Sequence, residues 1–248
     1  GSFVFSPPLL KIPPQTIVTL YATATDYMPG REPAISAEYR IFILSYAEHA
    51  RLIEEQLREL QARLEEAAFR EEELMEGNRE IDERNDEDLQ ATETDHDLNR
   101  SERGEQGNAR EMQALAEEMA KLIKEALRNE NFTEEMLKEW GELAEMMSEM
   151  ANQEMQEVAQ SLQNAQQSPP TPQGAQQRRE ELEKAIAKQR EILEKMREMA
   201  EKMTEELNNM AIRNLASRLR EASEAEKAIA VGLAKLLAEV VGMKTEAL

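Results

Sequence analysis

The stretch that decides the fold class is residues 182–210, which read LEKAIAKQREILEKMREMAEKMTEELNNM. Its repeat positions, almost all apolar, return at alternating steps of three and four, the spacing of helices that pack side by side in a coiled coil or bundle. This spacing predicts one long helix that buries a single narrow stripe. The stripe consists of Leu182, Ile186, Gln189, Leu193, Met196, Ala200, Met203, Leu207 and Met210.

Two earlier segments carry the same kind of repeat. The register of the second shifts near residue 150, and such a stutter is expected to relax the supercoil locally. The first segment comprises Ile53, Leu57, Leu60, Leu64, Ala67 and Leu74. The second comprises Met136, Trp140, Leu143, Met147 and Met150 and continues as Ala151, Met155, Val158 and Leu162.

The composition favours long helices over one compact core. Of the 248 residues, 4% are aromatic and 33% are charged, which is little material for a single large core. Glu, Gln, Ala, Leu, Met, Lys and Arg dominate after Ser45, and these residues lose little entropy in a helix. The sequence therefore predicts a mainly α fold, an antiparallel helical bundle or coiled coil with a short N-terminal β-hairpin.

Residues 3–44 have the period of strands. Apolar and polar residues alternate over residues 16–26 and again over residues 39–43, on either side of a turn-rich stretch. A two-stranded hairpin alone is marginally stable in water. Two interpretations follow: the hairpin is the end of a truncated Ig-like domain, or it is a separate hairpin that packs on the helices.

Capping and proline signals divide the rest of the chain. The capping box of Ser45 and Glu48 opens a helical region over residues 45–165. Within it, residues 77–107 carry many charges and few large apolar side chains, so we expect a frayed helix or an acidic linker there. A Pro- and Gln-rich linker should follow at residues 166–174.

Residues 175–248 are expected to hold a long helix and then a separate C-terminal helix. A second capping box at Ser223 would start the C-terminal helix, and Gly242 stands where a helix end is expected. The linker before residue 175 is long enough to let the two helices that flank it fold back on each other. This antiparallel pairing would bring Trp140 close to residues 203–210.

The charge and residue content argue against several function classes. A formal net charge of -21 repels nucleic acid and anionic membrane surfaces, and no long apolar run could insert into a bilayer. Cysteine is absent, and His49 and His96, the two histidines, stand outside any catalytic or metal motif. We therefore expect no enzyme, no catalytic residues and no cofactor.

Carboxylates in one part of the sequence and methionines in another are residue types that can bind metal ions. Each group also has a simpler structural interpretation. The carboxylates of residues 82–97 lack the spacing of a calcium loop. The methionines suit Cu(I) and so suggest a soft-metal or small-ligand carrier, but most of them fall on the apolar stripes, where Met fills a core. We expect no metal site. The clustered methionines are Met146, Met147, Met150 and Met155, and Met196, Met199 and Met203.

The leading hypothesis is a non-catalytic coiled-coil scaffold or protein–protein interaction module of a larger protein. Its expected partners are other proteins or a second copy of the chain in a homodimer, because narrow stripes on few helices leave apolar surface to cover. The expected interaction seam comprises Leu137, Trp140, Leu143, Met147, Leu193, Met196, Met203 and Leu207.

Several segments together resemble a known class of protein. They are LYATATD at 20–26, EYRIFIL at 38–44, NLASRLR at 214–220 and EAEKAIA at 224–230. The strand pair followed by Glu-, Gln- and Met-rich helices resembles large membrane-anchored bacterial envelope proteins of unknown function that carry Ig-like domains. The resemblance implies an extracytoplasmic location, in the periplasm or cell envelope, and no catalytic residues.

Overall fold

The computed structural model describes residues 5, 10–28 and 30–246, and for Ser217, Glu221 and residues 238–246 it describes the backbone alone. The chain divides into two compact units. One comprises residues 1–52 and 216–248, and the other comprises residues 53–215.

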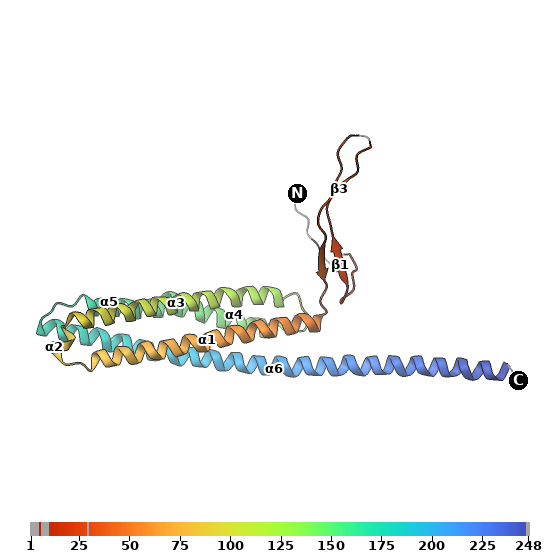
Figure 1. Ribbon diagram of the computed structural model, residues 1–248. Helices are drawn as coiled ribbons and strands as arrows, with labels where there is room; N and C mark the ends of the chain where they lie inside the picture. The colour runs from red at the N-terminus through yellow and green to blue at the C-terminus, as the bar shows by residue number, and fades with distance from the viewer. Residues whose placement is uncertain (1–4, 6–9, 29, 247–248) are drawn as a thin grey trace. The chain divides into compact units, whose positions relative to one another are not determined.

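The N-terminal strands form a β-hairpin, as the alternating pattern predicts (Figure 1). Strand β1 (Ile17–Leu20) pairs antiparallel with β4 (Tyr39–Phe42), and β2 (Thr23–Ala24) pairs with β3 (Ala34–Ile35). Among the described residues these two strand pairs are the whole of the β structure. The fold is therefore mainly α with a small hairpin.

The first helix, α1 (Tyr46–Asp82), begins at the predicted capping box. The backbone N–H of Ser45 donates to the Glu48 carboxylate over 2.8 Å, and the Glu48 N–H donates to the Ser45 hydroxyl over 3.2 Å. Both hydrogen bonds satisfy groups that a helix start leaves unpaired. Two hydrogen bonds to the Glu48 carboxylate hold its pKa below the ordinary value, which keeps the cap charged.

Residues 53–215 form an antiparallel four-helix bundle, in which α1, α3, the continuous run from α4 to α5, and the first part of α6 lie side by side (Figure 1). The remaining elements are α2 (Asp86–Leu89), α3 (Thr92–Ala126), α4 (Glu134–Glu149), η1 (Met150–Glu154), α5 (Met155–Gln166) and α6 (Pro172–Glu246).

Side-chain contacts establish the direction of each neighbour in the bundle. Along every pair of adjacent helices the residue numbers rise on one helix as they fall on the other, which is the up-down-up-down arrangement. Between α1 and α3 the contacts are Arg63–Glu111 and, just past the end of α1, Arg84–Asp97. Between α3 and the run from α4 to α5 they are Gln113–Asn152 and Asp95–Gln166. That run contacts α6 through Glu154–Lys195 and Asn164–Glu181, and α6 contacts α1 through Gln61–Thr204 and Asn78–Gln189.

The stutter near residue 150 appears as a π-helical turn. Residues 150–154, between α4 and α5, form the π-helix η1, which adds one residue to the turn. Both Met150 and Ala151 are buried there. The wider turn moves the apolar stripe from one register to the next without a break in the helix, so the predicted register shift is confirmed.

Of the two alternatives for residues 77–107, a helix or an acidic linker, the structure shows mostly helix. α1 runs on to Asp82 and α3 starts at Thr92, which leaves a short connection that includes α2, with Asn85 as its N-cap. The reason is that polar side chains occupy core positions of the repeat in this part of the bundle. These residues are Asn78, Ser101, Glu105 and Asn108.

The C-terminal segment also differs from expectation. α6 continues without interruption through Ser223 and Gly242, because the residues on either side of both positions are good helix formers and nothing stops the helix.

The connection between α5 and α6 is tighter than predicted, since α6 already begins at Pro172. Thr171 acts as the N-cap, and its hydroxyl accepts from the Gly174 N–H over 3.1 Å. A Cβ at Gly174 would lie 1.8 Å from the carbonyl oxygen of Pro169, so this turn requires glycine. The two helices still fold back as an antiparallel pair.

Candidate functional site

The structure places the predicted interaction seam inside the bundle. Leu137 is the exception: it is half-buried, and Met136 takes the core position beside it. These side chains therefore contact other helices of the same chain and offer no surface to a partner. The buried seam residues are Trp140, Leu143, Met147, Leu193, Met196, Met203 and Leu207.

Trp140 pairs with the expected part of α6. Its ring is fully buried and meets Phe132 edge-on, with ring centroids 5.6 Å apart. The Trp140 indole N–H also approaches the carboxyl group of Glu206, where burial raises the Glu206 pKa and the indole partly opposes that rise. The predicted contact between Trp140 and residues 203–210 is confirmed.

A layer of polar side chains crosses the middle of the otherwise apolar core. Three helices supply it, and none of its members is more than 8% exposed. We call it the polar layer; it comprises Glu71 and Asn78 of α1, Ser101, Glu105 and Asn108 of α3, and Gln189 of α6.

Hydrogen bonds join four side chains of the polar layer into one network and pair the other two. The side-chain amide of Asn78 donates to the side-chain oxygen Oε1 of Gln189 over 2.8 Å. The side-chain oxygen of Asn78 accepts from the Ser101 hydroxyl over 2.5 Å. The Gln189 amide donates to Glu105 Oε2 over 3.1 Å. On the other side, the Asn108 amide donates to Glu71 Oε2 over 2.9 Å. The network therefore ties α1, α3 and α6 together at one height.

The two carboxyl groups of the polar layer are electrostatically unusual. Burial raises the pKa of Glu71, and burial together with the nearby Glu71 charge raises the pKa of Glu105 well above its ordinary value. Within the described part of the chain, neither carboxyl group forms an ion pair.

The repeat contained a signal for this layer. Gln189 stands in the stripe of residues 182–210, and Glu71 and Asn78 continue the spacing of the first segment four and eleven residues beyond Ala67. A stripe defined by apolar residues alone leaves Glu71 and Asn78 out. Spacing without regard to polarity would have found them.

Two arginines hold the closed end of the bundle. Arg178, which is 4% exposed, donates to the carbonyl oxygens of Leu89 and Ala165 and pairs with Asp95 over 2.8 Å. Arg179 donates to the Asp82 carbonyl oxygen and pairs with Asp86 over 3.3 Å. These guanidinium groups satisfy the last carbonyl groups of α1, α2 and α5 and neutralise much of the acidic tract.

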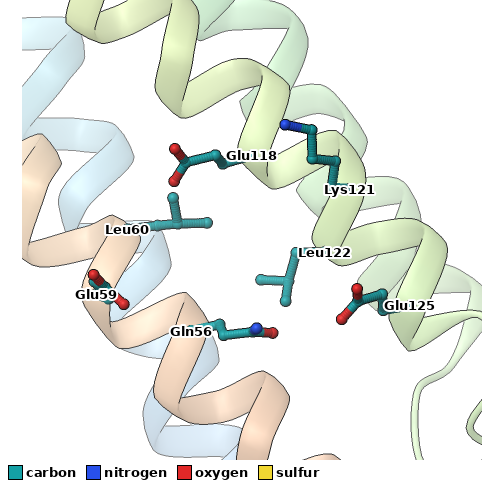
Figure 2. Close-up of a pocket in the computed structure, with 7 residues that line it drawn as sticks. All are labelled: Gln56, Glu59, Leu60, Glu118, Lys121, Leu122 and Glu125. Carbon is teal, nitrogen blue, oxygen red and sulfur yellow. The ribbon is translucent and has the colours of Figure 1, made fainter.

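The surface cavities of the bundle are lined by mixed charges. One cavity, with a volume of about 250 Å³, lies between α1 and α3. Figure 2 shows the residues that line it, which are Gln56, Glu59, Leu60, Glu118, Lys121, Leu122 and Glu125. A larger cavity of about 540 Å³ lies between α4 and α6 and is also rich in Glu. Neither brings together a nucleophile and a general base.

The candidate metal ligands are dispersed or buried as core. Met147, Met150, Met155, Met196 and Met203 are at most 1% exposed and occupy repeat positions. His96 is exposed and His49 is half-buried near the start of α1. Among the described residues, no group of three or more His, Asp or Glu side chains is arranged to hold a metal ion.

Six exposed apolar side chains of α6 lie along one side of the helix. Each is at least 55% exposed. Continuing the buried repeat beyond Met210 leads to Asn214 and Ser217, so this face is a new stripe with a different phase. We call it the α6 face; it consists of Ile212, Leu215, Leu219, Ile229, Leu233 and Leu236.

No protein-family model, curated protein or solved structure matches this chain.

Proposed function

We propose that this chain is a non-catalytic helical scaffold and interaction module of a larger protein, and that it self-associates through the α6 face. The observation that carries the proposal is the phase change after Met210. A helix that belonged only to its own bundle would turn polar there, whereas α6 continues with exposed apolar residues.

The spacing of the α6 face suits an antiparallel pair of identical helices. From Ile212 to Leu219 the residues of the face are spaced by three and then four positions, and from Ile229 to Leu236 they are spaced by four and then three. The spacing of the six residues is therefore symmetric about residue 224. A two-fold axis there would place Ile212 opposite Leu236, Leu215 opposite Leu233 and Leu219 opposite Ile229, with each layer made twice.

The charge distribution supports contact at this segment. Residues 211–237 contain five Lys or Arg and three Glu, whereas the whole chain has a net charge of -21. Two acidic bundles repel each other, and the C-terminal part of α6 is where two copies can approach with least repulsion. The paired length of residues 212–236 is about 37 Å at 1.5 Å per residue.

Light scattering on the whole chain tests the proposal. The mass at micromolar concentration is expected to be twice 28.3 kDa. The pair Leu219→Asp and Leu233→Asp should return the monomer mass, because charges at the centre of a packed stripe are unpaired and desolvated. Val231→Asp is the matched control, since Val231 is equally exposed but lies on the opposite side of α6. A wild-type protein of monomer mass would refute self-association.

Single cysteines determine the direction of the pair, because the chain has no cysteine of its own. An equal mixture of Leu219→Cys and Ile229→Cys proteins should oxidise to the mixed disulfide in an antiparallel pair. Disulfides between like chains alone would indicate a parallel pair and would contradict the proposed layers.

The alternative of a soft-metal or small-ligand carrier has less support, because all the clustered methionines except the exposed Met146 lie in the core. The extracytoplasmic location is also proposed, and the sequence resemblance is its support. Protease accessibility in intact cells that express the full parent protein would test it. Among helices of the described residues, none is long and apolar enough to cross a membrane.

A further inference from the structure

The carboxyl groups of Glu71 and Glu105 meet inside the bundle, on facing positions of α1 and α3. Both residues have no exposed surface. The two groups are close enough for each to shift the pKa of the other. The helices approach closely here, since a Cβ on Gly104 would lie 2.6 Å from Leu74 Cδ2.

Each carboxyl group has one oxygen with a donor and one without. Glu71 Oε2 accepts from Asn108, and Glu105 Oε2 accepts from Gln189. Glu71 Oε1 and Glu105 Oε1 are buried and have no donor in the structure. Two carboxylates would leave two acceptors and two negative charges unsatisfied in the core, which is a costly arrangement.

The surrounding charges do not relieve this repulsion. From α1, Arg70 pairs with Glu66 at 2.8 Å, and its Nε–H donates to the Asn108 amide oxygen at 3.5 Å. α6 presents the neutral Gln189. The buried residues of α5 are apolar, and on α3 the buried neighbours of Glu105 are Ser101 and Asn108. A calcium ion is a poor fit, because it takes six to eight oxygen ligands and only two oxygens are free.

We propose that Glu71 and Glu105 form a buried proton-binding site, which holds one proton between the two carboxyl groups at neutral pH and makes the stability of the bundle fall as the pH rises. The O–H of the protonated carboxyl group donates a hydrogen bond to the other carboxyl group, so both unpartnered oxygens gain a partner. This site is independent of the self-association proposed for α6.

The direction of the pH effect follows from the shifts. The pKa values of both groups are raised in the folded protein relative to 4.5, so the folded state binds protons that the unfolded state has released. The resulting stabilisation is complete below pH 4.5 and is lost as the pH rises through the folded pKa values. Where the folded state holds one extra proton, the unfolding equilibrium constant rises about tenfold per pH unit.

Urea unfolding of the whole chain between pH 4 and pH 9 tests the site. We compare the wild type with Glu105→Gln, whose amide can donate to Glu71 without a titrating proton. Glu117→Gln is the matched control, because it removes one negative charge from an exposed position of the same helix. The wild type and the control should share the decline above pH 4.5, and Glu105→Gln should lose most of it. Parallel curves for all three proteins would overturn the proposal.

Infrared spectroscopy of the folded wild type gives a second measurement that does not depend on a folded variant. At neutral pH one protonated carboxylic acid should absorb per chain, and the band should shift in deuterated water. A spectrum with carboxylates alone at neutral pH would also overturn the proposal.

Discussion

The side-chain amide of Asn78 donates to the carbonyl oxygen of Gln189 over 2.8 Å, although 111 residues separate the two in sequence. Both residues are fully buried. The same Gln189 side chain donates to Glu105, so one amide connects the first helix of the bundle, the second and the last. Gln189 and Asn78, which also accepts from Ser101, therefore each link all three helices of the polar layer.

Gln189→Leu should destabilise the bundle. Leucine has a similar size, but it leaves the Asn78 amide and Glu105 Oε2 without partners, at a cost of about 2–5 kcal/mol in the free energy of unfolding. Urea unfolding monitored by circular dichroism measures the change. Gln160→Leu, on the exposed side of α5, should change the free energy by less than about 0.5 kcal/mol. Equal effects of the two substitutions would argue against a structural role of the layer.

Two glycine-to-alanine substitutions should have opposite effects. Gly174→Ala brings a Cβ against the Pro169 carbonyl oxygen and should destabilise the turn before α6 by about 2 kcal/mol or more. Gly141→Ala, within α4, meets open space and should stabilise the protein by about 0.5–1 kcal/mol, because alanine loses less backbone entropy. Thermal unfolding of both variants measures the difference, and a stabilising Gly174→Ala would show that the turn has another conformation.

Arg178→Lys should weaken the closed end of the bundle. A lysine cannot reproduce the fork that bonds Ala165, Leu89 and Asp95 together, and we expect a loss of about 3 kcal/mol. Amide hydrogen exchange should speed up at the ends of α2 and α5 in this variant. Arg190→Lys, exposed on α6, should leave exchange there unchanged.

A Cu(I) titration under anaerobic conditions should show no stoichiometric binding to the folded chain. The thioethers of Met147, Met150 and Met196 are buried among other core residues, and a copper ion would have to open the core to reach them. Tight binding that Met196→Leu abolishes would instead support the carrier hypothesis.

The fold class could be predicted from the sequence because the repeat and the caps are local signals. The Ser45 capping box and the register shift at residue 150 both occur where expected. Each depends on residues within a few positions of one another, so a single sequence contains the whole argument.

The errors lie where distant residues decide the structure. The stretch of residues 77–107 is helical because Glu105 and Asn108 find partners on α1 and α6, which no local pattern reveals. The predicted seam residues other than Leu137 lie on the repeat, but they pack inside the bundle itself. The exposed face of α6 was not predicted, because its phase change can be recognised only once the buried face is known.

The polar layer also determines which of several alignments the helices adopt. A sequence of similar heptads can slide by seven residues and still bury apolar side chains, so the aligned and shifted bundles would differ little in hydrophobic energy. A slide of α6 by one heptad would place Leu182 or Met196 beside the Asn78 amide, which would lose the Gln189 oxygen as its acceptor. Such a misaligned bundle would leave buried donors and acceptors without hydrogen-bond partners. The polar layer thereby favours one alignment of the helices over the shifted ones.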